Sequence, residues 1–448
     1  MRYRGFLQAG LAAAIVVSTA GLVSPVRAAK LKQIYAFCQL QGCADGLIPD
    51  GSLTADASGH MYGVTTHGGA AGAGSVFELT PNAKRTKWSF STVHSFCVPN
   101  CETGVAPVDG IILDQQGNLY GQAYLGGRKD AGKVFELLPN KRHTSWKLKI
   151  LYSFCRERAC SDGMNPTGTL AYFGKSSGAP YDGVSPLYGV TGAGGIDNGG
   201  VVYALTPGAD GWTFQTLYRF CSAAGCADGK SPNGLTVDAS GNLFGTTYDG
   251  GVNAAGVAFE LAAANRSQTD TWQEAVLYDF CKQARCADGA YPISDLLTDS
   301  QGGLIGTTYF GGYTHKRCVV GGKLGCGVVF RLSPEGGSWT ESVLYTFCTK
   351  RACADGERPS GGVTMDDAGN LFGLTVYGGS TAGNDFGGGV VWELGQKHKT
   401  LYAFCPSGQC QDGIQPTGKL LRDSAGRYFG MTSSGGDAGG GTIFEITP

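Results

Sequence analysis

The sequence is poor in charged residues and in histidine. Only 16% of the 448 residues are Asp, Glu, Lys or Arg, and the formal net charge is −1. Such a surface offers no electrostatic reason to bind nucleic acid or an anionic membrane, so we expect neither as a partner. The six histidines share no repeat position and form no His-x-x-x-His pair. No histidine metal site is therefore predicted.

A recognisable catalytic motif is also missing. Gly174-Lys-Ser-Ser-Gly178 fits the spacing of a nucleophile elbow, but it lies in a Gly/Pro/Ser-rich stretch and not between a strand and a helix. The stretch is no phosphate loop either, because the upstream glycine is misplaced and no helix follows. We predict no catalytic residue and favour a protein that is not an enzyme.

Long hydrophobic runs are absent except at the start. Arg2 and Arg4 precede an apolar run from about residue 11 to 23, and Val26-Arg27-Ala28 fits a signal-peptidase site. Residues 1–28 are therefore a predicted signal peptide and 29–448 one mature domain; an uncleaved anchor is the alternative, although the run is short for a membrane span. We expect a secreted or periplasmic bacterial protein with no membrane span after cleavage.

Glycine and cysteine are abundant, and both follow a repeat. One unit recurs seven times, about every 57–67 residues, with a cysteine pair in each copy. After the pair come an acidic residue and Gly, a Pro, a strand ending in Asp-x-x-Gly, a Leu-Tyr/Phe-Gly strand, a Gly-Gly loop and Val-Phe-Glu-Leu. Most repeated residues should belong to the scaffold, so function is expected where the copies differ.

The sixteen cysteines predict eight local disulfides. An even count in an exported chain favours disulfides, and zinc, the alternative, would need two close pairs brought together. Seven pairs belong to the repeat and the eighth lies in one long loop. The predicted pairs are Cys38 with Cys43, Cys97 with Cys101, Cys155 with Cys160, Cys221 with Cys226, Cys281 with Cys286, Cys318 with Cys326, Cys348 with Cys353 and Cys405 with Cys410.

The strand pattern predicts an all-β, seven-bladed β-propeller with four antiparallel strands per blade. In the fourth repeat, 234–238 and 243–248 flank an Asp-x-x-Gly turn, and strands at 257–261 and 272–280 follow. By analogy with other propellers, the first strand is innermost. The mature chain begins with an unpaired outer strand, Leu31 to Phe37, which we expect to pair with Thr442 to Ile446 and complete the last blade.

These motifs resemble a known family. Gly241-Asn-Leu-Phe-Gly-Thr-Thr247, Gly369-Asn-Leu-Phe-Gly373, the Gly-Gly loops and Val-Phe-Glu-Leu are similar to GloVer tandem repeats over nearly all of 31–448. The resemblance implies export and tandem repeats, and the family is often found with a C-terminal anchor. It implies no particular reaction. Here the chain stops inside the repeat pattern and carries additional cysteines, so anchoring is not expected.

Acidic residues follow every cysteine pair and could form a ring. A cation such as calcium near the axis is one interpretation, with Asp228, Asp288 and Asp355 as the metal ligands; otherwise no cofactor is expected. The alternative is that each Asp-Gly pair stabilises a turn. The full ring comprises Asp45, Glu102, Asp162, Asp228, Asp288, Asp355 and Asp412.

A second ring is aromatic and differs between the copies. Tyr124, Tyr248, Tyr309 and Tyr377 end the second strands, beside the Gly-Gly loops, whereas the other repeats have Thr66, Ala193 and Ser433. Aromatic rims suit sugar rings or peptides, although half-buried strand ends are the alternative. The fifth repeat has the longest Gly-Gly loop, 311–327, and we predict that it contributes Tyr313, His315 and Arg317 to a ligand site.

Three functions stay open. The first is a scaffold that binds a glycan or an extracellular or periplasmic protein, which the lack of a catalytic constellation favours. The second is a secreted enzyme acting on a carbohydrate or a lactone, which acidic residues converging on the axis with a divalent metal would indicate. The third is a purely structural surface repeat, which a face without a pocket would indicate.

Overall fold

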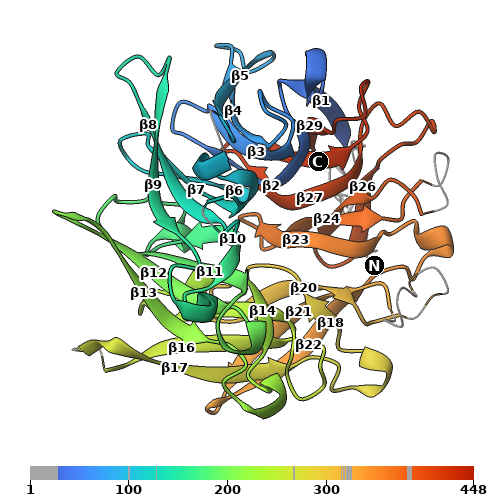
Figure 1. Ribbon diagram of the computed structural model, residues 1–448. Helices are drawn as coiled ribbons and strands as arrows, with labels where there is room; N and C mark the ends of the chain where they lie inside the picture. The colour runs from blue at the N-terminus through green and yellow to red at the C-terminus, as the bar shows by residue number, and fades with distance from the viewer. Residues whose placement is uncertain are drawn as a thin grey trace, which may run out of the picture.

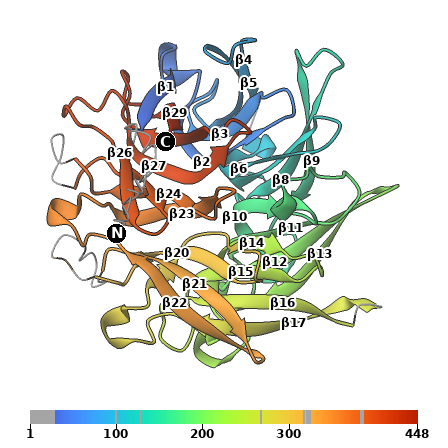
Figure 2. The same cartoon turned by 180° about the vertical axis from the view of Figure 1, so that it is seen from behind.

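The fold is known from a computed structural model that describes residues 29–98, 101–127, 129–265, 268–313, 315, 318, 325–380 and 386–448. The described chain is almost entirely antiparallel β-sheet, as predicted. Figures 1 and 2 show the sheets arranged around a central axis, which is a propeller-like architecture. Among the described residues, no helix is long and apolar enough to cross a bilayer. The predicted signal peptide lies outside the described residues.

Six sheets are present in this part of the chain. The largest has eight strands: β2 (Leu47–Ala55), β3 (Met61–His67), β4 (Ser75–Pro81), β5 (Trp88–Ser95), β6 (Val105–Leu113), β7 (Leu119–Leu125), β8 (Lys133–Pro139) and β9 (Trp146–Ser153). It consists of two four-stranded meanders that are joined through a single parallel pair, Ser52 with Gly110. These meanders are repeats 1 and 2.

Repeats 3 to 6 each form their own sheet. Their strands are β10 (Met164–Ala171), β11 (Leu187–Ala193), β12 (Val201–Gly208) and β13 (Gly211–Arg219); β14 (Lys230–Val237), β15 (Leu243–Asp249), β16 (Val257–Asn265) and β17 (Gln268–Asp279); β18 (Ala290–Pro292), β19 (Leu297–Thr298), β20 (Leu304–Phe310), β21 (Val328–Glu335) and β22 (Ser338–Thr346); and β23 (Glu357–Met365), β24 (Leu371–Tyr377), β25 (Val390–Leu394) and β26 (His398–Ala403). The first strand of repeat 5 is divided into β18 and β19, which both pair with β20.

The last sheet is closed by the first described strand of the chain, as predicted. Its strands are β27 (Ile414–Arg422), β28 (Tyr428–Ser434), β29 (Thr442–Thr447) and β1 (Lys30–Ala36). Strand β1 pairs antiparallel with β29, and Leu31 lies opposite Ile446. Phe37 follows β1, is fully buried and meets the ring of Phe77 edge-on at 5.2 Å, so this strand also joins repeat 7 to repeat 1.

The glycine of each Leu-Tyr/Phe-Gly strand makes room for an aromatic ring. In repeat 4, a Cβ on Gly245 would lie 2.6 Å from the ring of Phe259 on the next strand, and Gly373 stands in the same relation to Trp392 at 2.3 Å. The rings themselves are fully buried. Any larger residue at these glycines would have to displace a core ring, which explains why the glycine recurs.

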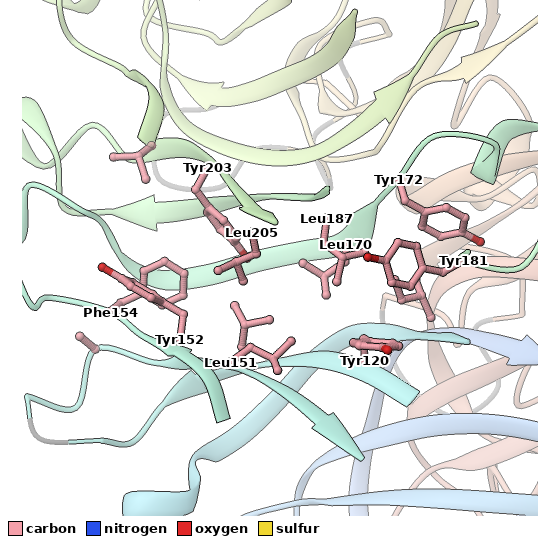
Figure 3. Packing of buried hydrophobic residues seen from close by; sticks show 14 of the residues in the cluster. Tyr120, Leu151, Tyr152, Phe154, Leu170, Tyr172, Tyr181, Leu187, Tyr203 and Leu205 are labelled. Atoms are coloured by element: carbon pink, nitrogen blue, oxygen red, sulfur yellow. The ribbon is translucent and has the colours of Figure 1, made fainter. Parts of the chain in front are cut away.

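The hydrophobic core lies between neighbouring sheets. Figure 3 shows the cluster between repeats 2 and 3, where Tyr120 and Leu151 face Leu170, Leu187 and Tyr203. Similar clusters lie at the other junctions between repeats. Each repeat therefore buries both of its faces against its two neighbouring repeats.

The first strand of each repeat lines the axis, in agreement with the predicted strand order. A narrow polar cavity of about 60 Å³ is lined by residues from all seven first-strand segments, among them Ser52, Asp109 and Lys419. Side chains connect these strands around the ring. Thr169 donates to the Asp109 carbonyl at 2.8 Å, and Asn233 donates to the Pro292 carbonyl at 2.7 Å.

Candidate functional site

The Gly-Gly loops and the cysteine loops lie together on one face, as the strand order predicted. The amide of the second loop glycine donates to the carbonyl of the second cysteine: Gly251 to Cys226 at 2.9 Å and Gly436 to Cys410 at 2.9 Å. The remaining repeats have the same bond. We call this side of the ring the loop face.

All eight predicted disulfides are present. Each cysteine is bonded to its predicted partner, and the described residues contain no free cysteine. In repeats 1 to 6 the second cysteine of the pair lies in a short 3-10 turn: η1 (Gln41–Cys43), η2 (Cys101–Thr103), η3 (Arg158–Cys160), η6 (Ala224–Cys226), η7 (Ala284–Cys286) and η9 (Arg351–Cys353). The disulfides therefore brace the loop face.

Repeat 7 departs from this pattern in its cysteine loop. Cys410 is bonded to Cys405 as predicted, but it lies outside any 3-10 turn. The loop instead turns immediately after the first cysteine, where the Gly408 amide donates to the Cys405 carbonyl at 3.3 Å. The sulfur of Cys410 also lies 3.8 Å from the Gly408 carbonyl. The seven cysteine loops therefore share their disulfide and not one common backbone conformation.

Seven residues on the loop face have a left-handed backbone. Each directly precedes the repeat proline, where sterics normally favour an extended conformation. Each amide donates to a Gly-Gly loop of the preceding repeat, as Arg358 does to the Cys326 carbonyl at 2.7 Å and Tyr291 to the Ala255 carbonyl at 2.7 Å. The seven are Ile48, Ala106, Asn165, Ser231, Tyr291, Arg358 and Gln415, with φ between 52° and 57°.

The side chains of these left-handed residues lie beside the predicted tyrosines. The Tyr291 ring is 5.2 Å from that of Tyr248, and the Arg358 guanidinium lies 5.7 Å from the Tyr309 ring and 5.2 Å from the Tyr377 ring. The resulting surface spans repeats 4 to 6, and we call it the aromatic band. Its members are Tyr248, Tyr291, Tyr309, Phe310, Arg358 and Tyr377.

The aromatic band is half-buried and continues into repeat 7. Phe310 and Arg358 are buried, and the tyrosines are partly exposed. The Gln415 side-chain amide lies 3.4 Å from the Tyr377 hydroxyl, which extends the band by one polar group. Burial raises the pKa values of Tyr248 and Tyr309 above 10. These two phenols are therefore neutral at physiological pH and can donate hydrogen bonds.

The other predicted ligand residues are Tyr124, Tyr313, His315 and Arg317. Tyr124 is 37% exposed and borders a different hollow, between repeats 1 and 2. Tyr313 is 50% exposed, and the His315 carbonyl accepts the Cys318 amide at 2.8 Å. Arg317 and most of its loop lie outside the described residues. A ligand role for these four residues stays a prediction.

The acidic residues after the cysteines have structural partners. Asp228 accepts the Tyr218 hydroxyl at 2.8 Å and the amides of Ser222 and Ala223. Asp288 and Asp355 accept the equivalent tyrosines, at 2.8 and 2.7 Å. We call this pair of an outer-strand tyrosine and the acid the Tyr–Asp clamp.

The Tyr–Asp clamp agrees with the second interpretation of the acidic residues, in which each Asp-Gly pair stabilises a turn. Its tyrosines belong to the outer strands, whereas the axis is lined by the first strands. A metal ion at Asp228, Asp288 and Asp355 stays a prediction, and it would have to compete with these hydrogen bonds.

The axial cavity gathers a different set of charges. Burial and the charge of Asp50 raise the pKa of Asp109 to about 7, although the carboxylate accepts the Gly168 amide at 2.7 Å. Lys175 belongs to the 171–184 insertion, and burial lowers its pKa to about 8. Asp109, Asp295 and Lys419 line the cavity, and the charges of Asp295 and Lys419 act on Lys175. About 60 Å³ admits water-sized molecules but not a sugar ring.

One buried group resembles a metal site in composition. Cys318, Cys348, Cys353 and Glu357 place three sulfurs and a carboxylate oxygen within 4.8 Å of one another. The three sulfurs belong to the disulfides Cys318–Cys326 and Cys348–Cys353. Thiolate is the form of cysteine that binds metals, so the oxidised cluster offers no thiolate ligand.

Sequence reasoning missed the residues that make the band continuous. Tyr291 and Arg358 precede the repeat proline, a position that holds seven different side chains in the seven copies. That variability is the signal that could have identified them. Because residues before proline are usually extended, the pattern did not suggest that their side chains would lie beside the tyrosines of two repeats.

Solved structures of several propeller-like proteins are similar to this chain. The extracellular domain of a putative hybrid two-component system from B. thetaiotaomicron is 11% identical, with a TM-score of 0.51 over 92% of this chain and 39% of that one. A gluconolactonase from Xanthomonas campestris is 15% identical, with a TM-score of 0.36 over 74% and 82% of the two chains. Trypanosoma rangeli sialidase is 11% identical, with a TM-score of 0.41 over 82% and 57%.

The first of these likenesses shows the fold alone, and the chain spans about two-fifths of the length of that structure. No curated protein sequence matches the chain. A family model described as the Gloeobacter/Verrucomicrobia repeat matches residues 18–185, 176–320 and 316–448. Because these matches cover nearly all of the sequence, the chain belongs to the Gloeobacter/Verrucomicrobia repeat family, as the GloVer resemblance implied.

Proposed function

We propose that this protein is a secreted or periplasmic seven-bladed propeller that binds a glycan on its loop face. The count of seven treats the two meanders of the eight-stranded sheet as separate blades, since only the Ser52–Gly110 pair joins them. Eight disulfides support residence in an oxidising compartment outside the cytoplasm. The predicted signal peptide would deliver the chain there.

The aromatic band is the observation that carries this proposal. Partly exposed tyrosines present flat apolar surfaces with a hydroxyl at the edge, which suits a sugar ring with its apolar face and polar rim. The stack of Arg358 on Tyr309 and Tyr377 fixes the orientation of the rings before a ligand arrives. Such preorganisation reduces the entropy lost on binding.

The alternatives differ in where they place the ligand. A protein ligand would use the same band, since tyrosine and arginine are also enriched at protein interfaces. A hydrolase or lyase acting on a carbohydrate or lactone would use the axial carboxylates Asp50, Asp109 and Asp295. The raised pKa of Asp109 suits a general acid, but the small cavity favours binding at the band. A purely structural repeat protein would not need the band.

The test is a glycan array followed by calorimetry on the best binder. Tyr309→Ala and Tyr377→Ala should each weaken binding by about tenfold, the loss expected for a stacked aromatic ring. Phe173→Ala is the control, since Phe173 is 56% exposed in the 171–184 insertion, outside the aromatic band.

Each outcome of this test decides between the candidates. Unchanged affinity in both tyrosine variants would reject the band as the glycan site. Capture of an extracellular protein without any glycan would favour the protein ligand, and cleavage of a glycan or lactone seen by NMR would favour the enzyme. Calcium titration with thermal melting tests the predicted metal: a rise in Tm that Asp288→Asn abolishes would support it.

A further inference from the structure

One junction between repeats lacks the Tyr–Asp clamp. At the other six, an outer-strand tyrosine donates to the acid at 2.7–2.8 Å: Tyr35–Asp45, Tyr152–Asp162, Tyr218–Asp228, Tyr278–Asp288, Tyr345–Asp355 and Tyr402–Asp412. Between repeats 1 and 2, His94 and Thr103 occupy these positions, and Glu102 comes one residue too early. The cysteine pair there has three intervening residues instead of four. The symmetry of the ring is therefore broken at this junction.

His94 and Thr103 do not reproduce the clamp. The Thr103 hydroxyl accepts the Cys97 amide at 3.0 Å, as a local turn contact. The Nε2 atom of His94 is buried without a hydrogen-bond partner among the described residues, and burial lowers its pKa. The imidazole is therefore neutral, and neither residue carries a charge in place of the missing aspartate.

A large hollow opens on the loop face at this same junction. Its volume is about 640 Å³, within the range of small-molecule sites. Ala73 from repeat 1 and Ala106, Val108, Tyr124 and Leu125 from repeat 2 line it, together with the Cys97–Cys101 disulfide. None of its described lining residues carries a permanent charge.

Several polar groups of the hollow already have partners. The Thr66 hydroxyl donates to the Ile48 carbonyl at 3.2 Å and lies 3.0 Å from Nδ1 of His67. The Ala106 amide donates to the Ala73 carbonyl at 2.9 Å, across the junction. A charged occupant would lose hydration here without gaining an ion pair from the described lining, whereas an apolar occupant would give up no hydrogen bond.

We propose that this hollow binds an uncharged, mainly apolar ring compound or ring substituent. The site is distinct from the aromatic band, and it does not depend on the glycan proposal. The sibling repeats vary at the positions of this lining: some have apolar residues, such as Ile48 at the position of Ala106 and Phe310 at that of Leu125, and others have polar or charged residues. Arg358 corresponds to Ala106, Asp249 to Leu125 and Asn233 to Val108.

The sibling residues also supply substitutions that the fold accepts. Ala106→Arg introduces a cation at a left-handed position where Arg358 has nearly the same φ, 55° against 52°. Leu125→Asp introduces an anion at a strand end where repeat 4 has Asp249. Ser231→Arg, at the equivalent position of repeat 4, is the control for adding an arginine to the loop face.

The probe is N-phenyl-1-naphthylamine, an uncharged apolar fluorophore whose emission rises in apolar surroundings. Wild type and Ser231→Arg should bind it with the same Kd, while Ala106→Arg and Leu125→Asp should bind at least about tenfold more weakly, because each buries a charge against the probe. Thermal melting checks that every variant is folded.

Three results would overturn the proposal. The first is that the wild type causes no increase in the emission of the probe. The second is that the Ala106→Arg and Leu125→Asp variants are both folded and bind the probe as tightly as the wild type. The third is that Tyr377→Ala no longer binds the probe. The last result would assign the probe to the aromatic band, and a glycan that still binds Ala106→Arg would leave the proposed function intact.

Discussion

His398 offers a direct test of how neighbouring outer strands are packed. Its ring is parallel to that of Tyr345, with 4.1 Å between the centroids. Burial lowers the pKa of His398 from 6.5 to about 4; Lys350 lowers it as well, and Asp355 opposes them. Both ring nitrogens are buried without a hydrogen-bond partner among the described residues. The folded protein therefore keeps this imidazole neutral at a pH where the unfolded chain takes up a proton.

The free energy of unfolding should therefore fall as the pH drops from about 6.5 to about 4, because the unfolded chain binds more protons there. At ~1.4 kcal/mol per pKa unit, the full effect approaches about 3 kcal/mol, and partial exposure of the ring reduces it to about 2 kcal/mol. His398→Phe removes the titrating group and keeps the stack, since Phe90 and Phe214 stack on their tyrosines at 4.2 and 3.9 Å.

Urea denaturation at about pH 7 and about pH 4.5 measures the effect. The wild type should lose about 2 kcal/mol more than His398→Phe between these two conditions. His143→Asn, at an exposed hairpin turn, is the control for removing a histidine and should behave as the wild type. Equal losses in the wild type and His398→Phe would refute the reasoning.

Three further predictions concern the outer strands and the closure of the ring. Burial and Asp228 raise the pKa of Glu274 to about 7, so the free energy of unfolding should fall as the pH rises from about 4.5 to 7 and the folded protein keeps a proton that the unfolded chain has lost. After allowance for the exposure of the side chain, Glu274→Gln should raise the free energy of unfolding by about 1–2 kcal/mol at pH ~8. The variant should leave it unchanged at pH ~4.5, and urea denaturation measures both values. Phe37→Ala should cost about 3–5 kcal/mol by calorimetry because the ring is fully buried, whereas Lys30→Ala on the exposed side of β1 should not; a small loss would contradict tight closure. Tyr278→Phe should cost about 1–3 kcal/mol in the same assay, since it removes a hydroxyl bonded to the carboxylate of Asp288, and unchanged stability would deny the clamp a structural role.

The sequence predicted the scaffold well because the residues that recur in every repeat each determine a turn, a strand or a disulfide. The Asp-x-x-Gly turns formed as expected: Asp238 accepts the amides of Ser240 and Asn242, both at 2.8 Å. The disulfides also followed from the predicted export and from the cysteine spacing, including Cys405–Cys410, whose loop has a different backbone turn. The pairing of β1 with β29 was predicted because Leu31 to Phe37 has the pattern of an outer strand, yet no repeat precedes it. Each of these features depends on residues that are close in sequence or repeated in every copy.

The candidate sites could be predicted only in part because they arise between repeats. Four tyrosines were identified where the copies differ, but Arg358 and Tyr291 join them through a backbone conformation that is uncommon before proline. The hollow beside Ala106 lies at the one junction where His94 and Thr103 take the places of the clamp's tyrosine and aspartate. Contacts of this kind depend on the distance and orientation between two neighbouring repeats, and the sequence of a single repeat does not specify either.

The pairing of β1 with β29 separates two stages of folding. Strand β1 is synthesised before all other described strands and its partner β29 after them, so Leu31 can pair with Ile446 only after almost the whole chain has been made. Forming that contact pays the entropy of closing a loop hundreds of residues long, whereas each repeat disulfide joins cysteines four or five positions apart. The repeat disulfides therefore need only local chain closure, whereas the sheet of repeat 7 is complete only when the two ends of the described chain have come together.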